Sequence, residues 1–274
     1  MKSFALTFLC FICVTVSAHT QYVKAEAKTI SQRFEVPKGY VQLNSDTTSF
    51  AYYLQNLPLK PHGTPVRMYD GRTKPNRSVY IGVIDLEIGN ANLQQCADAV
   101  IRLRAEYLYR QKRYSAVHFN LTNGFNAEYS KWKEGYRIEV TGNKTRWVKT
   151  SKPSNDYKTF RKYLDFVFTY AGTRSLSKEL TKVNFSNMQI GDVFIQGGSP
   201  GHAVIVVNMA ENPKTKEKIY LLAQSYMPAQ EIQVLQNPSN TNESPWYSLN
   251  KNSNAIPTPE WLFYTSDLKS FNIN

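Results

Sequence analysis

Residues 191–207 read GDVFIQGGSPGHAVIVV, and this stretch decides how the rest of the chain is interpreted. Two apolar runs flank a loop of three glycines, a serine and a proline. Because such runs between glycine-rich turns are typical of strands, we predict strands over 192–196 and 202–210. His202 opens the second strand, where it could take part in chemistry if a reactive partner lies beside it.

A third strand over 217–226 follows the polar loop ENPKTKEK, which predicts an antiparallel hairpin. A hairpin centred near Lys214 sets Gln224 opposite Val204, on the same face as His202. Same-face neighbours across a strand pair lie roughly 5–8 Å apart. Gln224 is therefore the predicted partner that orients the imidazole.

The clearest helix is predicted over 90–113, where apolar residues recur at three- and four-residue steps. Asn90 or Asn92 is the expected cap, which places Cys96 in the first turn. A second helix is expected over 155–170, followed by a short one after Gly172. Further strands are expected over 78–89, 114–125, 230–235 and 261–264. This order predicts an α+β fold in which helices pack on an antiparallel sheet.

The first 18 residues have a basic start, a short apolar run and small residues at their end, which is typical of a secretory signal. The apolar run is shorter than the roughly 20 residues of a membrane-spanning helix, although a retained anchor is an alternative. Removal of 18 residues from 274 leaves 256. We expect a leader over 19–34 and one domain over 35–274, with an insertion at about 111–190.

Loss of the signal removes Cys10 and Cys13, so the mature chain keeps only Cys96. An exported protein with one cysteine has no internal disulfide, and a single thiol in an oxidising compartment is either buried or used. Near a helix start, a thiol gains stabilisation of its anion, and a neighbouring imidazole can accept its proton. Cys96 is therefore the predicted nucleophile and His202 the predicted base.

The residues expected to bind substrate or the oxyanion surround this pair. They are Gln95, Gln94, Asn90, Gly198, Ser199 and Gly201. We expect the glycines to turn the backbone sharply and to leave room for a substrate. No metal or cofactor is expected, because the four histidines form no close pair and one cysteine cannot build a zinc site.

The cysteine before a helix, the GD-x-F strand and the GH strand start resemble the papain-like amidases of the NlpC and CHAP types. More closely, LQQCADAVIRLRAEYL, FRKYLDFVFTYAGTRSL, GGSPGHAVIVV and LLAQSYMPAQ resemble an exported bacterial family of unknown function (DUF4846-like) over about 35–271. The resemblance implies a papain-like core and the periplasm or cell envelope of a Gram-negative bacterium. Three features depart from the hydrolases: the 105 residues between cysteine and histidine, a glutamine as third residue, and the residues QQCADA around the thiol, where the hydrolases commonly have a small, hydroxyl-rich run.

These patterns together predict an exported thiol hydrolase that cleaves an amide in peptidoglycan or a peptide. The alternatives are a binding protein for glycan or peptide and a scaffold for another envelope protein. Cys96 could instead be a core residue, and His202 a structural one. Removal of the signal segment takes away one lysine, which lowers the net charge from +12 to +11. Because Lys and Arg are interspersed with Asp and Glu, we expect a basic surface and no nucleic-acid partner.

Overall fold

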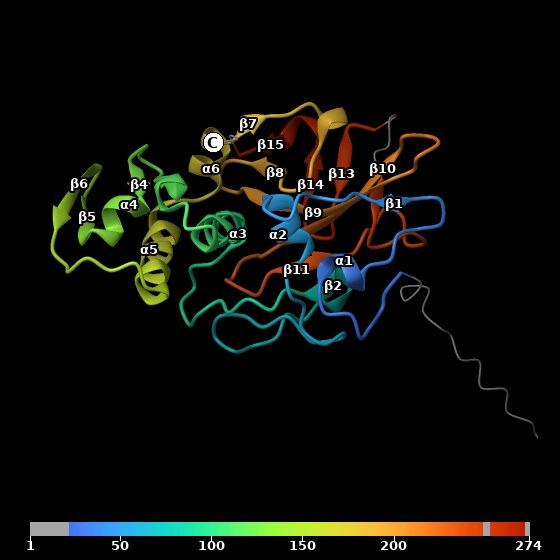
Figure 1. Cartoon of the computed structure of the whole chain (residues 1–274), viewed down its shortest axis with the longest axis horizontal. Coiled ribbons are helices and arrows are strands. Elements are labelled where there is room, and N and C mark those ends of the chain that lie inside the picture. The colour runs from blue at the N-terminus through green and yellow to red at the C-terminus, as the bar shows by residue number, and fades with distance from the viewer. Residues whose placement is uncertain (1–21, 249–252, 272–274) are drawn as a thin grey trace, which may run out of the picture.

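A nine-stranded antiparallel sheet forms the centre of the molecule (Figure 1). The computed structural model describes residues 22–248 and 253–271, so the expected signal segment lies outside the described residues. The strand order is β2-β11-β10-β9-β8-β15-β7, and β1 and β12 pair with β9 and β10, respectively. The fold is therefore a mixed α and β fold built on a large antiparallel sheet.

The helices are α1 (Ile30–Arg33), α2 (Phe50–Gln55), α3 (Cys96–Arg110), α4 (Tyr129–Lys133), α5 (Tyr157–Tyr170) and α6 (Thr173–Glu179). The strands of the large sheet are β1 (Val41–Gln42), β2 (Tyr80–Val83), β7 (Thr181–Lys182), β8 (Val193–Gln196), β9 (His202–Glu211), β10 (Lys218–Gln224), β11 (Gln233–Leu235), β12 (Tyr247–Ser248) and β15 (Leu268–Ser270). Three two-stranded sheets are formed by β3 (His118–Asn120) with β4 (Asn126–Glu128), β5 (Tyr136–Thr141) with β6 (Lys144–Lys149), and β13 (Ala255–Pro257) with β14 (Leu262–Tyr264).

Strand β9 is the central strand, and every residue in it except Glu211 is buried. Its side chains alternate between two cores. Ala203, Ile205 and Val207 belong to the core that includes α3. Val204 and Val206 belong to a second core on the opposite face, which includes Phe263 of the β13–β14 hairpin. The run of β-branched residues suits this strand because both of its faces are covered.

The predicted hairpin of β9 and β10 is confirmed. A register shift occurs between Leu221 and Leu222, after which Ala223 lies opposite Ile205. This register places Gln224 at the end of the strand pair, on the face that carries Val204 and His202.

Helix α3 starts later than the sequence suggested, and its cap is neither Asn90 nor Asn92. The N-cap is Gln95, whose backbone amide donates to Asp98 Oδ2 at 3.0 Å. Asn92 Oδ1 instead accepts the backbone amide of Ala229 at 2.8 Å, a contact with a distant loop. Cys96 is therefore the first helical residue, so the prediction that it lies in the first turn is confirmed.

The chain on either side of α3 builds the periphery of the molecule. Ile30 and Phe34, which we assigned to the expected leader, are fully buried in the main core. Elements β3 to α5 lie together at one end of the molecule, beside α3 (Figure 1). Because this lobe covers one side of α3 and the sheet covers another, most of the helix is buried.

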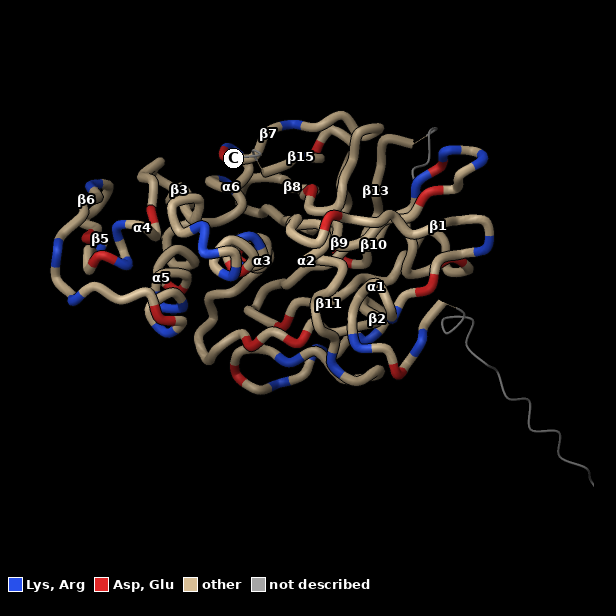
Figure 2. Tube along the Cα trace, viewed as in Figure 1, with Lys and Arg blue, Asp and Glu red and all other residues tan. Residues whose placement is uncertain are grey.

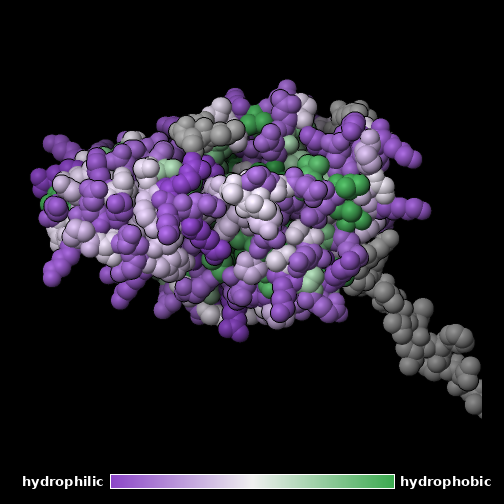
Figure 3. Space-filling model, viewed as in Figure 1, coloured by the Kyte–Doolittle hydropathy of each residue, from purple (hydrophilic) through white to green (hydrophobic). Residues whose placement is uncertain are grey.

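Charges of both signs are interspersed along the chain (Figure 2), and the face shown in Figure 3 is mostly hydrophilic with scattered apolar patches. Within residues 22–248 and 253–271, none of the helices combines the length and apolar character needed to cross a membrane.

Candidate functional site

Cys96 lines a pocket of about 510 Å³ at the N-terminal end of α3. Its side chain is half-buried, and the pocket walls come from the start of α3, the start of α6 and the 198–201 loop. The thiol therefore faces an opening and is not enclosed in the aliphatic core.

The surroundings of Cys96 favour the neutral thiol. Burial, with a smaller contribution from the carboxyl of Asp98, raises the pKa of Cys96 from 9.0 to about 11. Hydrogen bonds from the backbone amides of Ala203 and Ala97 act in the opposite direction but do not offset burial. Asp98 is itself buried, and burial raises the pKa of its carboxyl to about 8. At neutral pH the start of α3 therefore carries an uncharged thiol and a protonated carboxyl.

His202 is 2% exposed, and its ring lies in an aromatic enclosure. The ring centroids of Tyr226, Trp261 and Phe263 lie 5.1, 5.4 and 5.8 Å from that of the imidazole. Burial lowers the pKa of His202 from 6.5 to about 4, although the hydrogen bond to Gln224 opposes the shift. The imidazole is therefore neutral at pH 7.

Gln224 contacts His202 directly, with Oε1 at 2.8 Å from Nε2. The contact follows from the register of β9 and β10, which puts both side chains on one face of the sheet. It occupies Nε2 and leaves Nδ1 as the ring nitrogen that can accept a proton.

Cys96 and His202 approach the sheet from different sides. The imidazole projects from β9 toward the β13–β14 hairpin, whereas Ala97 of α3 packs in the core on the opposite face with Ala203. Two neighbours link them. The backbone amide of Ala203, the residue after His202, hydrogen bonds to the sulfur of Cys96. The ring of Tyr226 contacts the imidazole, and the pKa of Tyr226 is raised in part by Cys96. Among the described residues, however, His202 does not line the Cys96 pocket, and no direct contact joins the sulfur and the imidazole.

The glycine-rich loop is held by α6. A Cβ on Gly201 would lie 2.5 Å from Thr173 Oγ1, and one on Gly197 would lie 2.8 Å from the Cβ of Ser177. Thr173 Oγ1 also donates to the carbonyl of Gly198 at 3.2 Å. These glycines allow the loop to approach α6 closely, a physical reason that differs from the space for substrate that we expected.

The remaining predicted residues separate into two groups. Gln95, Gly198, Ser199 and Gly201 line the pocket with Cys96. Gln94 is buried, and its Oε1 accepts from Arg102 Nη1 at 2.7 Å, so it serves the α3 core. Asn90 is exposed and is not among the pocket-lining residues.

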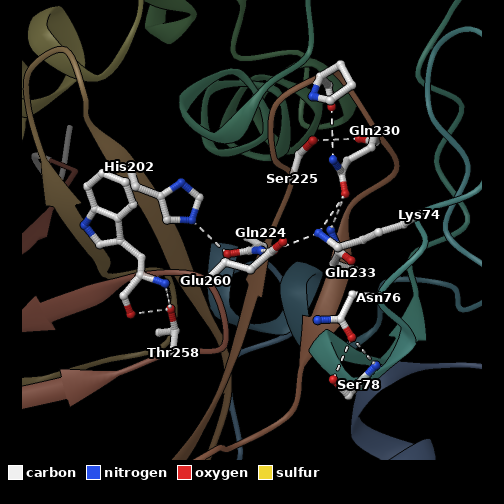
Figure 4. Close-up of polar contacts among 12 residues, drawn as sticks. Lys74, Asn76, Ser78, His202, Gln224, Ser225, Gln230, Gln233, Thr258 and Glu260 are labelled. Atoms are coloured by element: carbon white, nitrogen blue, oxygen red, sulfur yellow. Dashed lines mark hydrogen bonds and ion pairs between the residues drawn. The ribbon is translucent and has the colours of Figure 1, made fainter.

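Sequence reasoning missed two charged residues behind the histidine. Glu260 Oε2 accepts from Gln224 Nε2 at 2.6 Å and from Lys74 Nζ at 2.7 Å (Figure 4). The stretch PTPEWLFY precedes and includes a predicted strand, so its acidic residue offered a weak signal. Lys74 lies in a polar loop 186 residues away from Glu260, and nothing in the sequence connects the two.

His118, another histidine of the chain, is not among the residues that line the Cys96 pocket. Its Nδ1 is 3.9 Å from Glu179 Oε1, and its side chain is 41% exposed. Within the described part of the chain, no group of three or more His, Cys, Asp or Glu side chains is arranged to hold a metal ion.

The chain matches the family described as "Domain of unknown function (4846)" over residues 30–270, and it belongs to that family. Neither a curated protein nor a solved structure matches the chain.

Proposed function

We propose that this protein is an exported thiol hydrolase with a papain-like core that cleaves an amide bond in peptidoglycan or a peptide. One observation carries the proposal. The single thiol of the expected mature chain lines a pocket at the start of α3 and receives an amide hydrogen bond from the residue that follows a glutamine-bound histidine.

In the proposed reaction, Cys96 Sγ attacks the substrate carbonyl carbon while His202 Nδ1 takes the thiol proton. The C–N bond then breaks, the departing nitrogen takes the proton from the imidazolium, and a thioester remains. Water adds to the thioester carbonyl as His202 takes its proton. The C–S bond then breaks, and the departing thiolate takes that proton from the imidazolium, which restores the thiol and releases the carboxylic acid product. Gln224 holds the imidazole through Nε2, and the Cys96 backbone amide and the Gln95 side chain are the proposed oxyanion donors.

The resting state of this pair is neutral, since the pKa of Cys96 is raised and that of His202 is lowered. The proton must therefore move during the attack. General-base assistance of this kind contributes roughly 10²–10⁴-fold to a rate.

The same neutrality favours the second candidate, a non-catalytic binding protein for glycan or peptide. A thiol with a raised pKa is a weak nucleophile, because the thiolate is the reactive form. In that case the pocket binds its ligand without a covalent step.

Turnover of peptidoglycan fragments and acyl-peptides by Cys96→Ser, His202→Ala and the parent protein separates the two candidates. The hydrolase predicts that both variants lose at least about 100-fold in rate. His118→Ala is the matched control and should keep parental turnover, because His118 contacts neither Cys96 nor His202 and instead lies beside Glu179. Equal turnover by Cys96→Ser and the parent would remove the hydrolase.

The proposed location is the periplasm or cell envelope of a Gram-negative bacterium; export rests on the sequence of residues 1–18, and the bacterial envelope on the family resemblance. N-terminal sequencing of the protein from fractionated cells tests it. A mature chain beginning at His19 in the periplasmic fraction is expected, and an intact chain in the cytoplasmic fraction would contradict it.

A further inference from the structure

A row of three hydrogen-bonded contacts extends from His202 into the protein (Figure 4). His202 Nε2 is 2.8 Å from Gln224 Oε1, and Gln224 Nε2 is 2.6 Å from Glu260 Oε2. The same carboxylate oxygen lies 2.7 Å from Lys74 Nζ. The four side chains come from four separate segments of the chain, so the row is formed only in the folded protein.

The chemistry of these groups fixes the direction of each hydrogen bond. An ionised carboxylate only accepts, and an ammonium only donates. Glu260 therefore requires the NH₂ group of Gln224 to face it, which turns the Gln224 carbonyl oxygen toward His202. Because that oxygen only accepts, Nε2 of His202 must carry the proton.

Burial makes the arrangement costly to change. Lys74 and Gln224 are 5% and 1% exposed. Lys74 Nζ also donates to Gln230 Oε1 at 3.1 Å and lies 5.0 Å from the centre of the Tyr226 ring. If the Gln224 amide turned over, its oxygen would face the carboxylate oxygen of Glu260, and a charge-assisted hydrogen bond would be lost.

We propose that Glu260, acting through Gln224, holds His202 as the Nε2–H tautomer and so leaves Nδ1 as the proton acceptor. Glu260 is then a positioning residue, and Lys74 anchors its carboxylate. The catalytic meaning of this assignment rests on the proposed function, whereas the tautomer itself does not.

The test is NMR of the full mature chain with ¹⁵N-labelled histidine, in which the imidazole nitrogen shifts report the tautomer. The parent protein should show Nε2–H at His202. In Glu260→Met, Lys74 remains as a donor, so the Gln224 oxygen is free to turn toward it and the NH₂ group toward His202. The ratio of Nε2–H to Nδ1–H should then fall at least about tenfold, as expected for loss of a hydrogen bond to a charged group.

Two controls separate positioning from a general loss of stability. Lys74→Met leaves the Gln224–Glu260 hydrogen bond in place and should keep the parental tautomer. Glu231→Gln alters the Lys60–Glu231 ion pair, which has no contact with the row, and should also keep it. If Glu260→Met does not fold, the double variant Lys74→Met/Glu260→Met removes both charges. His202 in that variant should be a mixture of the Nε2–H and Nδ1–H tautomers.

An unchanged tautomer ratio in whichever of these two Glu260 variants folds, or an Nδ1–H imidazole in the parent protein, would overturn the inference. The outcome is distinguishable from failure of the proposed function. A protein with the predicted tautomer but no Cys96-dependent turnover would refute the hydrolase and leave the positioning of His202 intact.

Discussion

Alkylation of Cys96 by iodoacetamide should be slow at neutral pH and should accelerate with rising pH. The perturbation is pH alone, applied to the folded parent protein, and the reactive species is the thiolate. Burial and the Asp98 carboxyl raise the pKa of Cys96 from 9.0 to about 11. Because each pH unit below a pKa reduces the ionised fraction tenfold, a shift of about two units lowers the thiolate population about 100-fold relative to an ordinary thiol.

The assay is intact-protein mass spectrometry of the alkylated fraction against time, at intervals between pH 6.5 and 10. The rate constant should rise about tenfold per pH unit across this range without reaching a plateau. Unfolded protein in denaturant gives the reference rate and should react about 100-fold faster at pH 7.5. A plateau at neutral pH would mean that a thiolate–imidazolium pair already exists, and it would refute our account of a neutral resting site.

Three further predictions concern the residues around this thiol. Burial lowers the pKa of His202 from 6.5 to about 4, so the unfolded chain binds its proton first; this contribution to stability is present above pH 6.5 and is lost toward pH 4. This contribution amounts to about 3 kcal/mol. The free energy of unfolding in urea should therefore differ less between pH 7.5 and pH 4.5 in His202→Gln than in the parent protein. An equal difference in the two proteins would argue against the shift. Gly201→Ala should destabilise by about 1–3 kcal/mol in the same assay, because its Cβ would lie 2.5 Å from Thr173 Oγ1. Ser199→Ala shortens an exposed side chain in the same loop and is the neutral control. Equal losses in the two variants would contradict the close packing of the loop. Asp98→Asn keeps an acceptor for the Gln95 amide but removes a negative charge that is present above about pH 8. The alkylation rate of Cys96 should therefore rise at lower pH in this variant than in the parent protein. An unchanged pH profile would show that the Asp98 charge does not raise the pKa of the thiol.

Local pattern was sufficient to predict the centre of the fold. The runs of 192–196 and 202–210 form β8 and β9, and the polar loop after β9 gives the hairpin that brings Gln224 to His202. Helix α5 likewise ends at Tyr170, as expected from the break in the sequence around Gly172.

Errors arose where a distant contact overrides a local signal. Asn92 has the residue type of a cap, but its side chain binds the Ala229 amide, and the helix begins at Cys96. The β5–β6 hairpin was missed although Gly142, with a φ of +59°, marks its turn. Dipeptides such as the Gly-Asn at this position are a known hairpin signal.

The candidate site was only partly accessible from sequence. Alternation along β9 correctly grouped His202 with Gln224 on one face. It could not show which face α3 covers, so the approach of sulfur and imidazole from different sides of the sheet was not foreseen. The Lys74–Glu260 pair, formed between two loops, could be recognised only in the folded structure.

Acyl transfer from p-nitrophenyl acetate to Cys96 tests most directly whether the sulfur and the imidazole act together. The measurement is the rate of acetylation of Cys96 at pH 7.5, followed by peptide mass spectrometry in the parent protein and in His202→Ala. A His202-assisted proton transfer predicts a thioester on Cys96 that forms at least about 100-fold more slowly in the variant. Equal rates in the two proteins would show that His202 does not accept the thiol proton.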